Sequence, residues 1–210
     1  MVFGEIIEPS TRALCNDEYD DGEICDLSWK VTPCTPTTVK KLFITDTTPL
    51  LSVFKVCILS DVKPKYELNE TNLKIYEICD NNYVIASDDP KTISGNITEI
   101  IAPWIKCAAE VIILTTASDL PSGIKQLSYK MRSIHPKLDV PNLVTGISAS
   151  VFSYCVHINK NCSLFKVFLD EAPLDSINTV PLLNLIKTLG LNVLKMYKFQ
   201  ETSCYSNLYI

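Results

Sequence analysis

Glycine is scarce in this sequence, and histidine is scarcer. The 210 residues include six glycines, and neither GxGxxG nor GxxxxGK[ST] occurs, so the usual phosphate-binding loops of nucleotide enzymes are absent. His135 and His157 are the two histidines, and no cysteines have CxxC spacing, which excludes the common zinc-cluster patterns. We therefore expect no bound metal and no cofactor.

A GxSxG nucleophile elbow is also missing. Cys155 and His157 are two positions apart in a segment expected to be helical, so their side chains point in different directions and cannot form a nucleophile–base pair. His135 precedes a proline and has no visible partner. We expect no catalytic residue, and hence a protein that is not an enzyme.

Basic charge is not in excess either, because 19 Lys and Arg against 24 Asp and Glu give a net charge of −5. This balance argues against a nucleic-acid partner. No apolar run reaches the roughly 18 residues of a membrane span. The start, MVFGEIIEPSTRAL, has no basic region typical of a secretion signal. We expect a protein of the cytoplasm, or of the cytoplasm and the nucleus, whose nine cysteines are reduced and mostly buried.

The N-terminal part is mixed in character. NDEYDDGE (16–23) is an acidic run and TPCTPTT (32–38) is rich in Thr and Pro, so about 15–38 is expected to form a surface loop. The apolar VFGEII before it could be an edge strand or a docking arm. We expect one α/β domain over 1–196 and a C-terminal tail over 197–210.

Hydrophobic patterns predict the first regular elements. The β-branched and aromatic run 50–59 indicates a buried strand. The segments 73–79 and 83–87 flank the polar turn Asp80-Asn81-Asn82, which predicts a hairpin. Apolar residues at helical spacing predict a helix over about 95–108, capped by Ser94, with a kink or a break at Pro103.

The C-terminal half alternates strands and helices. Residues 110–118 form the clearest buried strand, followed by the loop SDLPSG and a polar stretch to about 141 with Pro136 and Pro141. A helix is expected over 146–159, a strand over 163–170, and a helix over 175–191 with Asp175 as N-cap and Gly190 near its end. This order predicts an α/β fold, a single three-layer domain whose mixed sheet is flanked by helices, with a flexible C-terminal tail.

The sequence finishes on Leu208-Tyr209-Ile210, three large side chains. They could form a last edge strand packed on the sheet, or a flexible peptide that ends in an anchor. About ten extended residues reach roughly 30 Å, enough to enter a neighbour's pocket. There the terminal carboxylate would pair with a lysine, Tyr209 would add a ring and a hydroxyl, and Leu208 would bury apolar surface.

Three stretches carry a resemblance to a known family. They are the start with Phe3-Gly4-Glu5, Pro9 and Arg12-Ala13, the segment 141–144 that leads into Ser153-Tyr154-Cys155, and the end 207–210. The sequence resembles the proteasome assembly chaperone 1 family in a shortened, invertebrate-like form. It lacks much of the charged N-terminal extension of vertebrate members, and its last residue is Ile rather than a small polar residue.

The resemblance implies a non-enzymatic chaperone of 20S proteasome assembly. Members of the family form a heterodimer with assembly chaperone 2, promote formation of the α-subunit ring, and dock on it through a hydrophobic-Tyr-X C-terminus. Docking prevents off-pathway dimers of α-rings and premature regulator binding. By position, Leu208, Tyr209 and Ile210 would enter the pockets between proteasome α subunits.

Two other functions fit the same sequence. A PDZ-type domain could bind the C-terminus, in which case Ile210 would be essential and Tyr209 replaceable, whereas proteasome docking has the opposite requirement. The second alternative is a small α/β hydrolase or nucleoside-processing enzyme. It would require convergent polar residues near 118–123 and 170–175, and the sequence does not indicate any.

Overall fold

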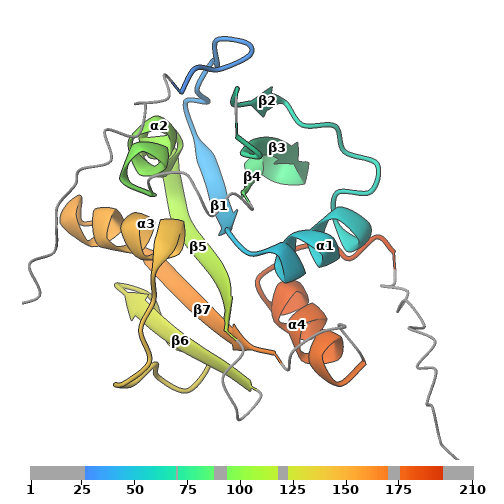
Figure 1. Cartoon of the computed structure of the whole chain (residues 1–210), viewed down its shortest axis with the longest axis vertical. Coiled ribbons are helices and arrows are strands. Elements are labelled where there is room, and N and C mark those ends of the chain that lie inside the picture. Colours follow the sequence, from blue (N-terminus) through green and yellow to red (C-terminus); the bar gives the residue numbers. More distant parts are fainter. Residues whose placement is uncertain (1–26, 70, 88–93, 118–122, 170–175, 196–210) are drawn as a thin grey trace, which may run out of the picture.

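A seven-stranded sheet forms the centre of the molecule (Figure 1). The computed structural model describes residues 27–69, 71–87, 94–117, 123–169 and 176–195. The strands are β1 Val39–Thr45, β2 Tyr66–Glu67, β3 Lys74–Ile78, β4 Asn82–Ala86, β5 Ala108–Ala117, β6 Gly123–Tyr129 and β7 Cys162–Phe168. The helices are α1 Thr48–Cys57, α2 Ser94–Cys107, α3 Gly146–His157 and α4 Ser176–Thr188, with a 3₁₀ turn η1 at Cys79–Asn81.

The sheet is mixed, with the strand order β2-β3-β4-β1-β5-β7-β6. The four central strands β4, β1, β5 and β7 are parallel, and Phe43 of β1 lies between Val84 of β4 and Ile112 of β5. At the edges, β2 and β3 pair antiparallel towards β4, and β6 pairs antiparallel with β7. The central strands are buried on both faces, which explains their nearly continuous apolar sequences.

Helices cover both faces of the sheet. Figure 1 shows α2 and α3 on one side, and α1 and α4 on the other. Trp104 of α2 and Val151 of α3 are fully buried in the first core layer, and Phe54 of α1 and Ile186 of α4 are fully buried in the second. The predicted fold class is confirmed: a single α/β domain of three layers with a mixed sheet.

The strand predicted over 50–59 is wrong, because this segment is helix α1. Its buried residues Leu50, Val53, Phe54 and Cys57 recur at three- and four-residue spacing, while Lys55 is exposed. Pro at the helix start fits α1, since its missing N–H would have no partner in the first turn. The helical spacing of the buried residues and the proline at the first turn therefore indicate a helix more strongly than the β-branched residues indicate a strand.

Other predicted elements are confirmed. Strands β3 and β4 form the expected hairpin, and Asn81 in its turn has a φ of 58°, the left-handed region that Asn tolerates. Helix α2 runs from Ser94 to Cys107 with Pro103 inside, so the chain does not break at that proline. Strands β5 and β7 and helices α3 and α4 also lie where the sequence places them.

Three strands, β1, β2 and β6, come from stretches in which the sequence indicated no element. β1 is the central parallel strand, and β6 lies within the polar stretch before residue 141. Residues 27–38, part of the expected surface loop, have no regular structure except a bridge between Trp29 and Leu68. The VFGEII segment, the acidic run, Asp175, and the ranges 118–122 and 170–175 lie outside the described residues.

Candidate functional site

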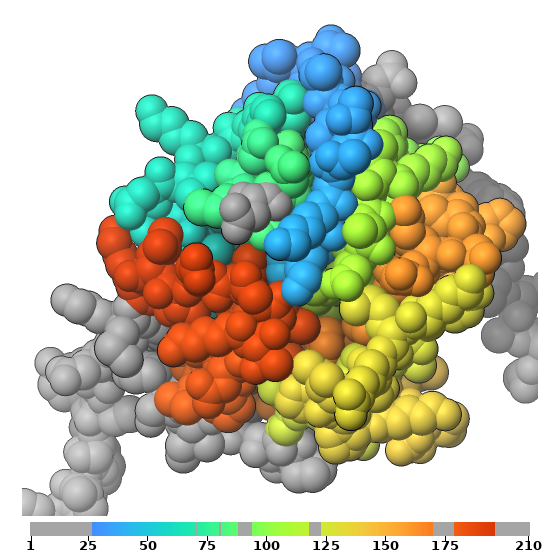
Figure 2. All heavy atoms as spheres, turned by 180° about the vertical axis from the view of Figure 1, so that it is seen from behind, coloured from blue at the N-terminus to red at the C-terminus, as the bar shows by residue number. Residues whose placement is uncertain are grey.

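The predicted docking residues Leu208, Tyr209 and Ile210 lie outside the described residues, so their role stays a prediction, as does the boundary at 196. The structure does describe the segment 189–195, from which the predicted tail continues. Figure 2 shows α4 and this segment in red, beside the cyan residues of α1 and the loop after it.

Two hydrogen bonds fix the segment 189–195 on the domain. Lys41 Nζ of β1 donates a hydrogen bond to the carbonyl of Leu189 (2.7 Å). The Leu194 N–H donates to the carbonyl of Cys57 at the end of α1 (2.7 Å). Between them Gly190 has a φ of 91°, a conformation that favours glycine and ends helices, as predicted for this residue. The predicted tail therefore starts from a fixed point at the end of the sheet where β1 and β4 begin.

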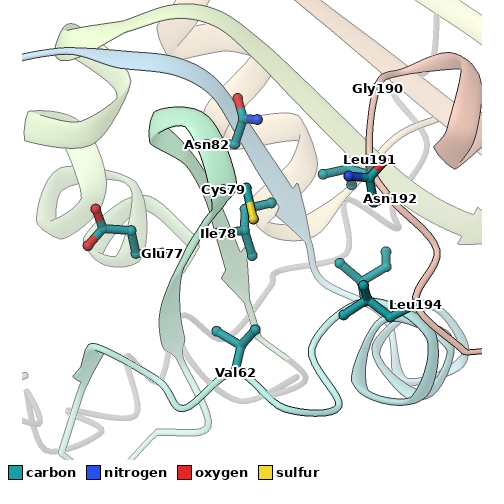
Figure 3. A pocket seen from close by; sticks show the side chains of 10 residues that line it. Val62, Glu77, Ile78, Cys79, Asn82, Gly190, Leu191, Asn192 and Leu194 are labelled. Atoms are coloured by element: carbon teal, nitrogen blue, oxygen red, sulfur yellow. The ribbon is translucent and has the colours of Figure 1, made fainter.

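A small pocket of about 200 Å³ adjoins this base (Figure 3). The side chains of Val62, Ile78 and Leu194 lie around it and come from the α1–β2 connection, β3 and the segment after α4. Leu194 is 57% exposed, and the buried Asn82 Oδ1 in the lining has no hydrogen-bond partner among the described residues. The pocket could accept a single apolar side chain with one hydrogen-bond donor.

Ion pairs surround this pocket. The pKa of Asp61 is lowered by hydrogen bonds from Ser60 and from Lys195, which lies 3.4 Å away and two residues before the predicted tail begins. The pKa of Glu77 is lowered by its hydrogen bond from Lys65. Both carboxylates are exposed to solvent, so these pairs orient side chains more than they stabilise the fold.

A second polar site lies at the opposite end of the central strands, where β1 and β4 finish. The helices that follow these two strands, α1 and α2, pack on opposite faces, which is where α/β folds often bind ligands. Asp46 Oδ2 accepts a hydrogen bond from the Ser148 N–H (2.9 Å) in the first turn of α3. Five buried side-chain oxygens here have no hydrogen-bond partner among the described residues: Thr45 Oγ1, Asp46 Oδ1, Thr47 Oγ1, Ser87 Oγ and Ser148 Oγ.

This polar cluster was not predicted from the sequence, although a signal was present. Thr45-Asp46-Thr47 precedes a Pro near a helix start, which is the composition of a strand-to-helix turn. Ser148 is 102 positions from Asp46, so only the fold brings them together. The carboxylate of Asp46 occupies the positive end of α3, and it thereby opposes binding of an anion there.

The candidate nucleophile pair is separated in the structure, as expected. Cys155 is buried and shares a hydrogen bond with Cys162, which together with burial raises the pKa of the Cys155 thiol. His157 is exposed at the end of α3, and the His135 ring packs edge-on against Phe165 (centroids 5.9 Å apart). Burial lowers the pKa of His135. These thiols and rings form no nucleophile–base pair among the described residues.

Two further findings concern metals and membranes. Within the ranges that the structure describes, no group of three or more His, Cys, Asp or Glu side chains could hold a metal ion. None of the helices described is both long and apolar enough to cross a membrane. The six cysteines described, Cys34, Cys57, Cys79, Cys107, Cys155 and Cys162, are free thiols.

Comparison with known proteins gives structural likeness without sequence likeness. No protein-family model matches the chain, and no curated protein matches it significantly. PbaA of Pyrococcus furiosus, described as an archaeal homolog of proteasome-assembly chaperone, matches with a TM-score of 0.59 at 14% identity, covering 80% of this chain and 87% of its own. PbaB of the same organism, described as an archaeal proteasome activator, matches with a TM-score of 0.54 at 12% identity, covering 80% and 90%.

A third structure points to the same fold. The proteasome-assembly chaperone homologue of Mycobacterium tuberculosis matches with a TM-score of 0.50 at 12% identity, covering 73% of this chain and 86% of its own. At such identities the likeness establishes the architecture, while the resemblance to chaperone 1 in particular stays a prediction. The chain shares its three-layer fold with homologues of proteasome-assembly chaperones.

Proposed function

We propose that this protein is a non-enzymatic chaperone of 20S proteasome assembly. It pairs with a related α/β protein, assembly chaperone 2, and promotes formation of the ring of proteasome α subunits. It docks on that ring through Leu208, Tyr209 and Ile210, and so prevents α-rings from dimerising off the pathway. It acts in the cytoplasm, the nucleus or both.

The observation that carries the proposal is the fold shared with PbaA, which is described as an archaeal homolog of proteasome-assembly chaperone. Many α/β proteins are enzymes, so the fold class by itself would not favour a chaperone. The likeness covers four fifths of this chain and most of the PbaA chain. Independently of the fold, the hydrophobic-Tyr-X ending supports the same function.

The fixed base of the predicted tail is consistent with docking by the C-terminus. Fifteen residues separate Lys195 from the end of the printed sequence, and an extended chain of that length spans about 50 Å. The hydrogen bonds at Leu189 and Leu194 hold the start of this reach on one end of the domain. Because the base is fixed, the domain itself would lie over the outer face of the ring near the bound tail.

The chemistry of the three docking residues makes distinct demands. Tyr209 would bury its ring and hydrogen-bond through its hydroxyl, and Leu208 would contribute about 1.5–3 kcal/mol if fully buried. The terminal carboxylate of Ile210 would pair with a lysine of the α-subunit pocket. The side chain of Ile210 is the part that this mode of docking tolerates changing.

The experiment is a pull-down of tagged protein from cells, with quantitative mass spectrometry of what binds. Four forms are compared: the unchanged chain, Tyr209→Ala, Ile210→Ala, and a form with two glycines added after Ile210. We expect unchanged chain to capture α subunits and a second α/β chaperone. Tyr209→Ala and the extended form keep the chaperone and lose most α subunits, while Ile210→Ala retains them.

Two outcomes would contradict the proposal. If no form captures a proteasome subunit, the protein is not a proteasome chaperone. If the unchanged chain captures PDZ-domain proteins and Ile210→Ala loses them while Tyr209→Ala does not, the C-terminus serves the alternative adaptor function.

A further inference from the structure

Charge is divided unevenly between two parts of the chain. Residues 123–169, which form β6, α3, β7 and their connections, contain six Lys and Arg and a single acidic residue, Asp139. The rest of the chain contains 13 Lys and Arg and 23 Asp and Glu. One edge of the sheet is therefore basic in a protein whose net charge is −5.

Three lysines lie at the ends of neighbouring elements: Lys106 in the last turn of α2, Lys160 after α3 and Lys130 after β6. Lys160 Nζ donates to the carbonyl of Lys106 (2.7 Å), which joins the chain after α3 to the end of α2. Beside Lys160, Asn159 Oδ1 accepts from the Tyr129 hydroxyl (2.8 Å), so Lys130 follows at the same end of the sheet. We name Lys106, Lys160 and Lys130 the lysine track.

The lysine track has no carboxylate partner among the described residues. Lys106 and Lys130 are exposed, Lys160 is half-buried, and the ammonium of Lys130 lies 5.9 Å from the centroid of the Tyr129 ring. The ion pairs found in the described ranges all use other lysines: Lys30, Lys41, Lys65, Lys74 and Lys195. The track is thus a row of cations available to an acidic ligand.

The described chain begins beside β2 and next to the end of α2, which carries Lys106 of the track. Leu27 and Trp29 pack on the core layer beneath α2 and α3. The ring of Trp29 lies 5.4 Å from that of Trp104, which precedes Lys106 by two residues. The acidic run 16–23 ends four residues before Leu27 and contains five carboxylates: Asp17, Glu18, Asp20, Asp21 and Glu23.

The chain between Leu27 and the acidic run 16–23 is long enough for the run to contact the lysine track. The acidic run lies four to eleven residues from Leu27, a reach of about 13–37 Å when extended. Helices α2 and α3 pack side by side, as the hydrogen bond from Thr98 to Ser150 (2.8 Å) shows, and such helices are separated by about 8–10 Å. The track therefore lies within reach of the run, on the side of the sheet where the described chain starts.

We propose that the acidic run 16–23 docks along the lysine track of the same chain. Five carboxylates face three lysines, so the contact is electrostatic and weakens as salt screens it. Docking neutralises part of the basic edge and covers the junction of α2 and α3. This contact is separate from the proposed docking function of the C-terminus.

The test is zero-length cross-linking of the full chain with a carbodiimide, which joins a carboxylate to an amine in direct contact. Trypsin releases the run in one peptide bounded by Arg12 and Lys30, and mass spectrometry identifies its linked lysines. We expect links to Lys106, Lys130 and Lys160 several-fold above links to the exposed Lys55 and Lys63 on the other side of the sheet. In about 0.5 M salt, where screening acts within a few ångströms, these links fall to the level of the controls.

A variant series separates docking from chance proximity. Changing the three track lysines to Gln should speed alkylation of Cys15 and Cys25, which flank the run, whereas the Lys55→Gln and Lys63→Gln double variant should not. A mixture of isotopically light and heavy protein distinguishes links within a chain from links between chains. Equal linking to Lys55 and Lys63, links that persist at high salt, or links mainly between chains would each overturn the proposal.

Discussion

Replacing Gln126 with leucine should destabilise the protein and release the loop after β6. Gln126 is 1% exposed, and its Oε1 accepts hydrogen bonds from the N–H groups of Ile134 (2.8 Å) and His135 (3.1 Å). Its Nε2 donates to the hydroxyls of Ser128 (2.6 Å) and Ser163 (3.2 Å). The two N–H donors fix the amide orientation, because only an oxygen can accept from them.

The cost follows from what leucine leaves without a partner. The change removes the acceptor for two backbone N–H groups and one donor for two hydroxyls, and each buried polar group left unsatisfied costs about 1–3 kcal/mol. The hydroxyls of Ser128 and Ser163 can still pair with each other at 3.1 Å. Ile134 is half exposed, so its N–H can reach water once the loop moves. We therefore expect a loss of about 2–3 kcal/mol in the free energy of unfolding.

Urea unfolding measures the change in the free energy of unfolding of the whole domain, and amide hydrogen exchange shows which residues lose protection. We expect a lower urea midpoint with an unchanged slope, and faster exchange at Ile134 and His135 than in the unchanged protein. Ser128→Ala is the control, since it removes one hydroxyl and leaves both contacts of Oε1 in place. A loss below about 0.5 kcal/mol, or full protection of both amides in Gln126→Leu, would refute this account of the loop.

Three further predictions concern a helix cap, a surface ion pair and the thiols. Asp46→Ala should cost about 1–2 kcal/mol in urea unfolding because α3 loses its capping carboxylate, and Asp46→Asn should cost less because an acceptor remains. The hydrogen bond from Lys65 lowers the pKa of Glu77, so this carboxylate contributes fully to folding stability above the ordinary glutamate pKa near 4.5. That contribution is lost as the pH falls through the pKa of Glu77 in the folded protein. Glu77→Gln should therefore flatten the dependence of the melting temperature on pH in that acidic range. Alkylation mapped by mass spectrometry should modify the exposed thiols within minutes and spare the buried ones until the protein unfolds. The exposed thiols are Cys34 and Cys79, and the buried ones are Cys57, Cys155 and Cys162.

The sequence predicted those elements whose hydrophobic period was unambiguous. β5 and β7 are short apolar runs bounded by polar residues, and α3 is too long for a strand. The run that became α1 contains ten residues, a length at which strand and helix patterns both fit. β6 alternates poorly because Gln126 is buried on a face where an apolar residue would be expected. Such a position can be recognised only when the loop that Gln126 holds is known.

Part of the candidate site could be predicted from the sequence, and part depends on the folded structure. Leu208, Tyr209 and Ile210 could be predicted as docking residues from the sequence because a short linear motif carries its chemistry in consecutive residues. The base of the predicted tail could not be anticipated, since Lys41 contacts Leu189 across 148 positions. The lysine track also depends on tertiary structure, because only folding brings Lys106 to Lys160.

The carboxylate at the first turn of α3 disfavours a phosphate ligand at that point. Where β1 and β4 end, a phosphate placed at the first turn of α3 would meet the Asp46 carboxylate, which already accepts the Ser148 N–H at 2.9 Å. At the other end lie the base of the predicted tail and the lysine track, both near the surface and both suited to peptide partners. A nucleotide enzyme would need the reverse arrangement, with free N–H groups at the helix start and no carboxylate there. The position of Asp46 thus argues against a phosphate site at the start of α3, and this observation is independent of both the C-terminal motif and the likeness in fold.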